Sequence, residues 1–396
     1  MSVRWLLLVA GWSVGWWLLW RVPSVRRRPA VDGAAGGQDP PAPPAVLDVA
    51  VVIPARNEEL SLPNLLDSLV HQTSRPAEII VVDDQSDDAT AALASAVSGV
   101  TVLSSRPLPS GWTGKSWACQ QGADAARSPR LVFLDADVVL APGALAEIVA
   151  RGEERGGLVS VQPYHRMERP YERLSAVFNI IGFMGVGSAS PGRDARASRG
   201  AFGPVLTCSD ADYRAIGGHA SVRGEIVDDV AIAQEFEGHD LPVHVFGGGS
   251  EVSFRMYPAG AGQLVEGWSK NFATGAGSVA VSRFLLIGLW VTAMLISVQV
   301  AVDALLEPSV GALVVAATVV VAAVLQVRHF LRQLGTFGWG WAIAYPIPLA
   351  MFLVVFARSV WLTAVRRQVQ WRGRDVPLAR SARWEVAAVP VDDAAG

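Results

Sequence analysis

Leu131-Val132-Phe133-Leu134-Asp135-Ala136-Asp137 is the stretch that decides the fold, because an apolar run ends there at two carboxylates one residue apart. Such a run predicts a strand buried on both faces of a parallel sheet. Ligands of these sheets bind at the carboxyl ends of the strands. In an extended segment Asp135 and Asp137 would share a face, so we expect them to bind one hard divalent cation together with substrate phosphates. Two solvated acids in a turn are the alternative.

Strands and helices alternate on the N-terminal side of this stretch. Apolar runs predict buried strands at 49–53, 78–82 and 100–103, and helical spacing predicts helices at 62–70 and 89–97. This order predicts the α/β class with a mostly parallel sheet. Asp83 and Asp84 follow the second strand, where they would either cap the next helix or bind the base or ribose of a nucleotide.

Two further sites carry charges whose role the pattern leaves open. Gly111 to Ser116 departs from the phosphate-loop pattern, so Lys115 either directs its charge at a diphosphate or is a solvated surface lysine. Asp228 and Asp229 open an amphipathic segment and act there as helix caps or as functional acids.

Leu174 to Met184 is apolar and aromatic, which is typical of a core helix or of a segment that admits lipid at a membrane interface.

The composition favours a membrane protein with a cytosolic domain. Of the 396 residues, 51% are hydrophobic and 17% are charged, and the net charge of −3 argues against nucleic-acid binding. We expect Cys119 and Cys208 to be reduced thiols, and the histidines to be ordinary core or surface residues.

Apolar stretches at both ends set the expected domain organisation. Residues 1–22 are expected to be an N-terminal anchor and 23–48 a Pro/Gly/Ala-rich linker. Apolar runs at 284–302, 310–327 and 339–361 predict a transmembrane region over 281–365, followed by a cytosolic or flexible tail over 366–396. The charge distribution favours a multi-pass protein of the cell membrane whose main domain is cytosolic. The run at 339–361 either spans the membrane or is kinked, re-entrant or interfacial.

Four motifs in order resemble the signature of family 2 glycosyltransferases. They are Val52 to Glu58, Val81 to Asp87, Asp135-Ala136-Asp137 and Asp228-Asp229. Leu108 to Lys115, Gly217 to His219, Arg255 to Tyr257 and Trp268 to Asn271 are similar to segments of the bacterial hopanoid-associated and carotenoid-acid members of that family.

This resemblance implies a GT-A fold over residues 49–280, a nucleotide-diphosphate sugar donor such as UDP-glucose, Mg²⁺ or Mn²⁺ as cofactor, and inversion at the anomeric carbon. Asp229 falls at the general-base position with Asp228 beside it, and Asp137 and Asp135 fall at the metal. The positions expected at the nucleotide sugar are Pro54, Arg56, Glu58, Asp83, Asp84, Lys115, Asp135 and Lys270.

The function expected from these observations is transfer of one sugar to a lipid acceptor, a carotenoid acid or hopanoid-like molecule, at the cytosolic membrane face. A polyprenyl-phosphate glycosyltransferase and a processive polysaccharide synthase are the enzymatic alternatives. The synthase motif Gln-x-x-Arg-Trp is replaced by Gln263 to Trp268, which is one residue longer and has no arginine. A catalytically silent membrane scaffold with the same fold is the alternative from another class.

Overall fold

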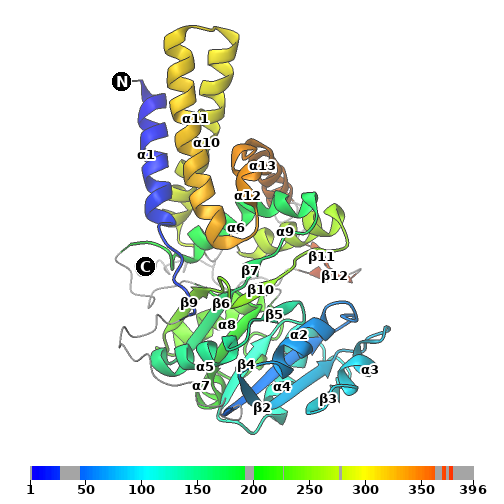
Figure 1. Ribbon diagram of the computed structural model, residues 1–396. Coiled ribbons are helices and arrows are strands. Elements are labelled where there is room, and N and C mark those ends of the chain that lie inside the picture. Colours follow the sequence, from blue (N-terminus) through cyan, green and yellow to red (C-terminus); the bar gives the residue numbers. More distant parts are fainter. Residues whose placement is uncertain are drawn as a thin grey trace, which may run out of the picture.

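The protein consists of an α/β domain and a group of apolar helices that projects from it (Figure 1). The computed structural model describes residues 2–26, 45–191, 200–225, 227–275, 279–361, 368–371 and 374–377, with side chains left undescribed at 45, 270–275, 368–371 and 374–377.

A seven-stranded sheet forms the centre of the α/β domain. In spatial order its strands are β3 (Val100–Ser104), β2 (Ser74–Asp83), β1 (Ala45–Ala55), β4 (Arg130–Leu134), β8 (Val205–Ser209), β6 (Leu158–Gln162) and β9 (Val243–Gly247). All neighbouring pairs are parallel except those of β8 with β4 and β6. The predicted α/β class with a mostly parallel sheet is therefore confirmed.

Helices and a second sheet surround this centre. The helices are α2 (Leu62–Val70), α3 (Thr90–Ser95), α4 (Gly114–Ala125), α5 (Ala144–Arg155), α7 (Asp210–Ala215) and α8 (Asp228–Gly238). The second sheet contains β5 (Val138–Leu140), β10 (Val252–Phe254) and β7 (Tyr164–His165). Short 3₁₀ helices lie at η1 (Pro170–Ser175) and η3 (Gly218–Ala220), and β11 (Gln368–Trp371) pairs with β12 (Arg374–Pro377).

The strand predicted to end before Pro54 continues through it to Ala55. Pro54 pairs with Val82 of β2, whereas pairing of β1 with β4 stops at Val52. Beyond Val52 one edge of β1 is free of ladder bonds, so the missing N–H of proline removes none there. The extra residues bring the end of β1 level with Asp83, because Ala55 is its partner in the register.

The two acids of the opening stretch lie in a turn, not in an extended segment. β4 ends at Leu134 and β5 begins at Val138, and the Val138 N–H donates to the Asp135 carbonyl over 3.1 Å. The Asp135 N–H in turn donates to the Pro204 carbonyl over 2.9 Å. The expectation that Asp135 and Asp137 share a strand face was therefore wrong, because the chain must reverse direction to begin the second sheet.

The apolar helices pack into one cluster that adjoins the α/β domain. They are α1 (Val3–Leu18), α6 (Ala176–Val186), α9 (Ala261–Gly275), α10 (Val281–Leu306), α11 (Val310–Leu334), α12 (Gly338–Ile343) and α13 (Pro346–Trp361). Figure 1 shows α1 lying along α10 and α11 in the projecting part, while α13 lies beside α6 and α9. The predicted apolar run at 339–361 forms two helices instead of one, because the chain turns near Tyr345 and Pro346 begins a new helix.

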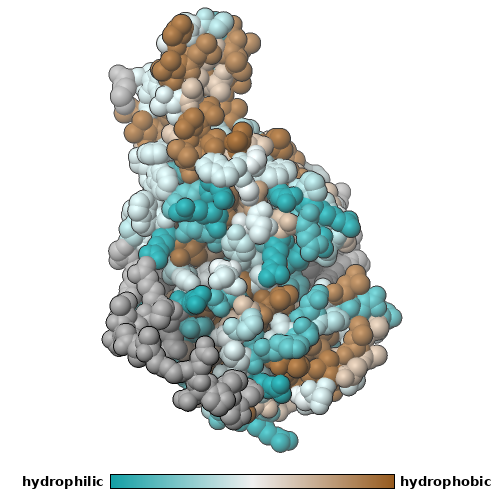
Figure 2. Space-filling model, viewed as in Figure 1, coloured by the Kyte–Doolittle hydropathy of each residue, from teal (hydrophilic) through white to brown (hydrophobic). Residues whose placement is uncertain are grey.

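Two of these helices, α10 and α11, are long and apolar enough to cross a membrane. The helices α1 and α13 are also apolar but have only 16 residues each. Large apolar side chains are exposed along α10 and α11, among them Leu305, Leu306 and Val310, which are 74–82% exposed. The space-filling view shows this apolar surface on the projecting part (Figure 2).

The first residues of the expected linker are packed against the α/β domain. Val25 is fully buried and its N–H donates to the Gly247 carbonyl over 3.1 Å. Ser24 forms an isolated parallel bridge with the same glycine. The end of α1 is therefore joined to β9 through a short ordered segment.

Candidate active site

A single cavity of about 1060 Å³ collects most of the predicted site residues. The carboxyl ends of β1, β2 and β4 and the start of α8 bring these residues together. The predicted residues that line the cavity are Pro54, Arg56, Glu58, Asp84, Lys115, Asp135, Asp137, Asp228 and Asp229. Asp83 is buried at the end of β2 but does not line the cavity, and the side chain of Lys270 lies outside the described residues.

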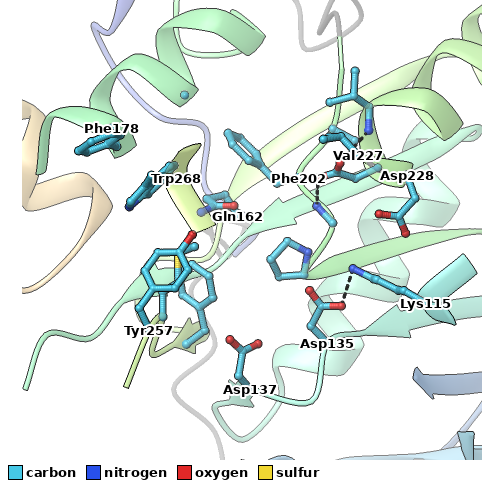
Figure 3. Close-up of a pocket in the computed structure, with 18 of the residues that line it drawn as sticks. Lys115, Asp135, Asp137, Gln162, Phe178, Phe202, Val227, Asp228, Tyr257 and Trp268 are labelled. Carbon is cyan, nitrogen blue, oxygen red and sulfur yellow. Dashed lines mark hydrogen bonds and ion pairs between the residues drawn. The ribbon is translucent and has the colours of Figure 1, made fainter. Parts of the chain in front are cut away.

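Lys115 and Asp135 form an ion pair within the cavity. The Lys115 Nζ lies 2.7 Å from Asp135 Oδ1 (Figure 3). Burial works against the charged amine, but the carboxylates of Asp135 and Asp228 outweigh it and hold the pKa of Lys115 well above its usual value. Lys115 therefore carries a positive charge at the acidic edge of the sheet, where it is paired with Asp135.

The position of Lys115 follows from the helix that begins beside it. Thr113 is the N-cap of α4, and its Oγ1 accepts a hydrogen bond from the Ser116 N–H at 3.3 Å. Gly114 is the first residue of α4, and a Cβ at this position would collide with Asp84 Oδ2. The glycine thus lets the helix start against the end of β2.

Asp84 and Asp83 occupy different surroundings although they are neighbours. Asp84 Oδ2 lies 3.5 Å from Nη1 of Arg56 and faces the cavity. Asp83 Oδ2 accepts from the Ser86 N–H at 3.4 Å, whereas its buried Oδ1 has no hydrogen-bond partner among the described residues. Neither acid caps α3, because the N-cap of that helix is Ala89. A buried carboxylate oxygen without a partner is unusual in a folded protein.

Asp137 and Asp135 suit a divalent cation by their charge and their oxygen atoms. Burial raises the pKa of Asp137 to about 7, and the carboxylates of Asp135 and Glu58 add to the rise. A cation bound there would relieve this accumulation of negative charge. No group of three or more His, Cys, Asp or Glu side chains in the described residues is arranged to hold a metal. Two carboxylates still fit Mg²⁺ or Mn²⁺, since Mg²⁺ is usually held by one or two carboxylates together with substrate phosphates and water.

Asp229 is held at the cavity by two backbone N–H groups. Its Oδ2 accepts from Gly203 at 2.7 Å and its Oδ1 from Val230 at 2.9 Å. Burial, and after it the neighbouring carboxylate of Asp228, raise the pKa of Asp229 to about 6, although Lys115 opposes the shift. Both acids lie in the first turn of α8, but neither is its N-cap residue, which is Val227.

The loop that carries Gly203 is fixed by a buried serine on β6, an interaction that the sequence did not reveal. Ser160 Oγ donates to the Phe202 carbonyl and accepts from the Phe202 N–H, both at 2.8 Å. The same loop places the Phe202 ring 4.9 Å from that of Phe183 on α6. The sequence offered only a glycine-rich turn at this place, because the partner on β6 is some 40 residues away.

The other half of the cavity is apolar and aromatic. Phe178 of α6 stacks on Trp268 of α9 with ring centroids 4.9 Å apart, and Tyr257 lies beside Trp268 at 6.1 Å. Figure 3 shows these three rings on one side, the ion pair of Lys115 on the other, and Phe202 and Gln162 between them. Residues of α10 and α13 complete the apolar half, and no sequence motif had linked those helices to the site.

The remaining candidate residues are structural. Cys119 and Cys208 are buried free thiols, as predicted. His219 is buried, its Nδ1 lies 2.8 Å from the Tyr213 hydroxyl, and burial lowers its pKa to about 4. His244 is also buried and His239 is exposed, so these histidines are ordinary core or surface residues.

A mostly parallel sheet with acids at its carboxyl edge, joined by one cavity to an aromatic pocket, defines a ligand site of the α/β class. The sequence model for glycosyl transferase family 2 matches residues 50–191. The chain belongs to this family and is a glycosyltransferase, because long alignments with characterised members support the same assignment.

Those members are named 4,4'-diaponeurosporenoate glycosyltransferase. The Staphylococcus aureus protein (strain MRSA252) is 34% identical over 337 residues, which cover 84% of this chain and 89% of the relative. The Staphylococcus haemolyticus protein is 36% identical over 333 residues, covering 82% and 88%. Among solved structures, the mannosyltransferase PcManGT from Pyrobaculum calidifontis, in complex with GDP-Man and Mn²⁺, is similar with 18% identity and a TM-score of 0.46, over 89% of this chain and 95% of that one.

Proposed function

We propose that this protein transfers one sugar from a nucleotide-diphosphate sugar such as UDP-glucose, with inversion, to a lipid of the carotenoid-acid type at a membrane surface. One observation carries the proposal: the acidic and cationic groups at the sheet edge share a single cavity with an aromatic and apolar region built from α6, α9, α10 and α13. A soluble acceptor needs no such region. The long alignments with diaponeurosporenoate glycosyltransferases support the same acceptor class.

The donor diphosphate is proposed to lie at Lys115, with the nucleotide near Pro54, Arg56, Glu58, Asp83 and Asp84. Positive charge at Lys115 stabilises the negative charge that grows on the leaving diphosphate. Mg²⁺ or Mn²⁺ held by Asp135 and Asp137 would supply further stabilisation of that charge when bound. The ion pair of Lys115 with Asp135 keeps the ammonium at the sheet edge before the donor binds, and Lys270 is proposed as a second cation nearby.

Asp229 is proposed to face the nucleophilic oxygen of the acceptor. The carboxylate of Asp228 beside it is proposed to raise the pKa of Asp229. An alcohol acceptor must lose its proton to Asp229 as it attacks the anomeric carbon. Such general-base catalysis typically accelerates a reaction roughly 10²- to 10⁴-fold. A carboxylic acid with an ordinary pKa near 4 arrives already ionised. For such an acceptor Asp229 serves mainly to position the attacking oxygen.

The apolar helices are proposed to anchor the enzyme in the cell membrane with the α/β domain, residues 49–280, on the cytosolic side. Asp303 and Glu307 lie at the far end of α10, whereas Arg328 and Arg332 lie at the end of α11 nearer the α/β domain. This distribution follows the positive-inside rule. Arg4, at the far end of α1, is paired with Asp303 at 2.7 Å, which reduces its cost there. Exposed Trp20, Trp339 and Trp361 suit a membrane interface.

The test is transfer of label from UDP-glucose into the organic-soluble fraction of membranes that contain the protein. We expect label in lipid with the native chain, dependence on Mg²⁺ or Mn²⁺, and loss with Asp135→Asn plus Asp137→Asn. Asp229→Asn should reduce transfer as well, most strongly to alcohols. Asp240→Asn is the matched control, because Asp240 is exposed outside the cavity and its positive φ of 59° suits asparagine.

Three other results would each replace the proposal. Labelled lipid that releases its sugar in mild acid and carries a phosphate would indicate a polyprenyl-phosphate acceptor. Labelled material insoluble in organic solvent would indicate a polymer synthase. No transfer with any donor sugar by the native chain would indicate a silent scaffold.

A further inference from the structure

The apolar half of the cavity is walled by helices of the apolar cluster. Phe284, Ile287, Gly288 and Val291 of α10 line the cavity. Their spacing of three, four and seven residues places them on one face of that helix. The side of α10 at Leu289 and Ala293 packs against α1, where a Cβ at Gly11 would collide with Leu289. The helix therefore uses one side for packing and the other for the cavity wall.

The cavity wall of α10 contains an exposed rim. Phe284 is 46% exposed, and Gly288 is also exposed, whereas Ile287 between them is buried. Across from this rim, α13 contributes Leu353 and Phe356 to the cavity lining. The rings of Phe284 and Phe356 have centroids 6.5 Å apart. The rim of the cavity thus includes the contact between α10 and α13, beside a helix apolar enough to cross a membrane.

Glycine leaves space free along this rim. A Cβ at Gly288 would meet no atom within 4 Å, and Cβ atoms at Gly182 and Gly185 of α6, which also line the cavity, would first meet atoms at 3.8 and 3.5 Å. A glycine inside a helix costs about 1 kcal/mol relative to alanine. Helix formation and packing therefore do not require glycine at position 288, and the space it leaves belongs to the cavity.

We propose that the cavity opens to the bilayer at this rim between α10 and α13, and that the acceptor enters sideways there, with Gly288 setting the width available to its hydrocarbon chain. The occupant is one long, slender apolar chain that ends in an oxygen nucleophile. Its chain lies among α6, α10 and α13, and its polar end passes Phe202 and Gln162 toward Asp229. This inference rests on the proposed function, and it identifies the route and the residue that select the acceptor.

The opening acts through its width and not through hydrophobic affinity. A hydrocarbon chain leaving the bilayer exchanges one apolar environment for another, since lipid tails are as apolar as leucine. Little free energy of transfer is then available to offset a steric conflict at the rim. A bulky side chain at position 288 should therefore weaken use of long acceptors while leaving the donor site unchanged.

Gly288→Leu tests the opening directly, with Gly311→Leu of α11 as matched control. A Cβ at Gly311 also meets nothing within 4 Å, but Gly311 does not line the cavity. The long acceptor is 4,4'-diaponeurosporenoate in phosphatidylglycerol vesicles, and the short one is sorbate, a small conjugated carboxylate. Release of UDP from UDP-glucose without lipid acceptor reports on the donor site.

We expect Gly288→Leu to raise the KM for the long acceptor at least about tenfold. Transfer to sorbate, UDP release and the KM for UDP-glucose should stay at the native values, and Gly311→Leu should match the native chain throughout. Leu353→Trp narrows the same opening from α13 and should give the same acceptor-specific loss if Gly288→Leu lowers thermal stability. A native KM for the long acceptor in either folded variant overturns the proposed route. Absence of lipid transfer by the native chain itself overturns the proposed function instead.

Discussion

Asp229 combines burial, a carboxylate neighbour and two backbone donors, and this combination makes a pH dependence predictable. Its pKa is raised to about 6 by burial, with a further contribution from Asp228. The base form is the ionised carboxylate, so it is present above pH 6 and lost below it. With a lipid alcohol as acceptor and saturating Mg²⁺, we expect kcat/KM to rise with pH through about 6.

Retinol and retinoic acid offer a matched pair of probes for this prediction, because they differ only in the nucleophilic group. The profile for retinoic acid should be flatter, since a carboxylate needs no proton removed. Asp228→Asn removes a like charge and should move the midpoint for retinol to lower pH. Identical profiles for the two acceptors would contradict the role of Asp229 as a base.

Gly114 shows how one small residue holds the donor side of the site. Alanine at this position would bring Cβ onto Asp84 Oδ2, so the Asp84 side chain must turn away from Arg56. We expect Gly114→Ala to weaken UDP binding by roughly tenfold, about 1.4 kcal/mol, even though alanine is the better helix former. Titration calorimetry with UDP measures the change. Gly238→Ala, at the end of α8 with open space around it, serves as control and should bind UDP like the native chain.

At the level of single elements, α4 is the helix that fixes Lys115, and its N-cap is the place to test this. Thr113→Ala removes the side-chain acceptor for the Ser116 N–H and should lower stability by about 1 kcal/mol. Thr113→Ser keeps a hydroxyl and should stay close to the native stability. Thermal unfolding in detergent compares the three proteins. Equal midpoints for Thr113→Ala and the native chain would show that α4 is held by packing alone.

The sequence allowed the sheet and its acidic edge to be predicted, because both depend on local patterns. Apolar runs identified β1, β2, β3 and β4, and the acids follow directly on β2 and β4, which lie on either side of β1 in the sheet. The turn at Asp135 was only the alternative to an extended segment, because it depends on β5 pairing with β10, more than 100 residues away. The aromatic half of the cavity was missed for the same reason, since α6, α10 and α13 meet only through tertiary packing.

In the whole molecule, a sheet that positions charged side chains is joined to a helix group that exposes apolar surface. Within the helix group, Gln326 of α11 links α1 and α10. Its Nε2 donates to the Trp12 carbonyl at 2.7 Å, and its Oε1 accepts from Trp290 at 3.0 Å. A polar link of this kind fixes how the helices rotate against one another. That rotation in turn sets which face of α10 lines the cavity.

The orientation of this assembly in a membrane is open to a direct test, because both native cysteines are buried and free. A membrane-impermeant maleimide should therefore report only on introduced thiols. Pro308→Cys lies in the exposed turn between α10 and α11, and Ser98→Cys lies in an exposed turn of the α/β domain. In intact cells we expect labelling of Pro308→Cys alone, since the positive-inside rule predicts that the α/β domain lies inside. Ser98→Cys should be labelled only after lysis.

Labelling of Ser98→Cys in intact cells would place the sugar-transfer site outside, where a cytosolic nucleotide sugar does not reach it. Labelling of both would show that α10 and α11 do not cross the membrane, and it would leave the opening beside Gly288 facing water instead of lipid.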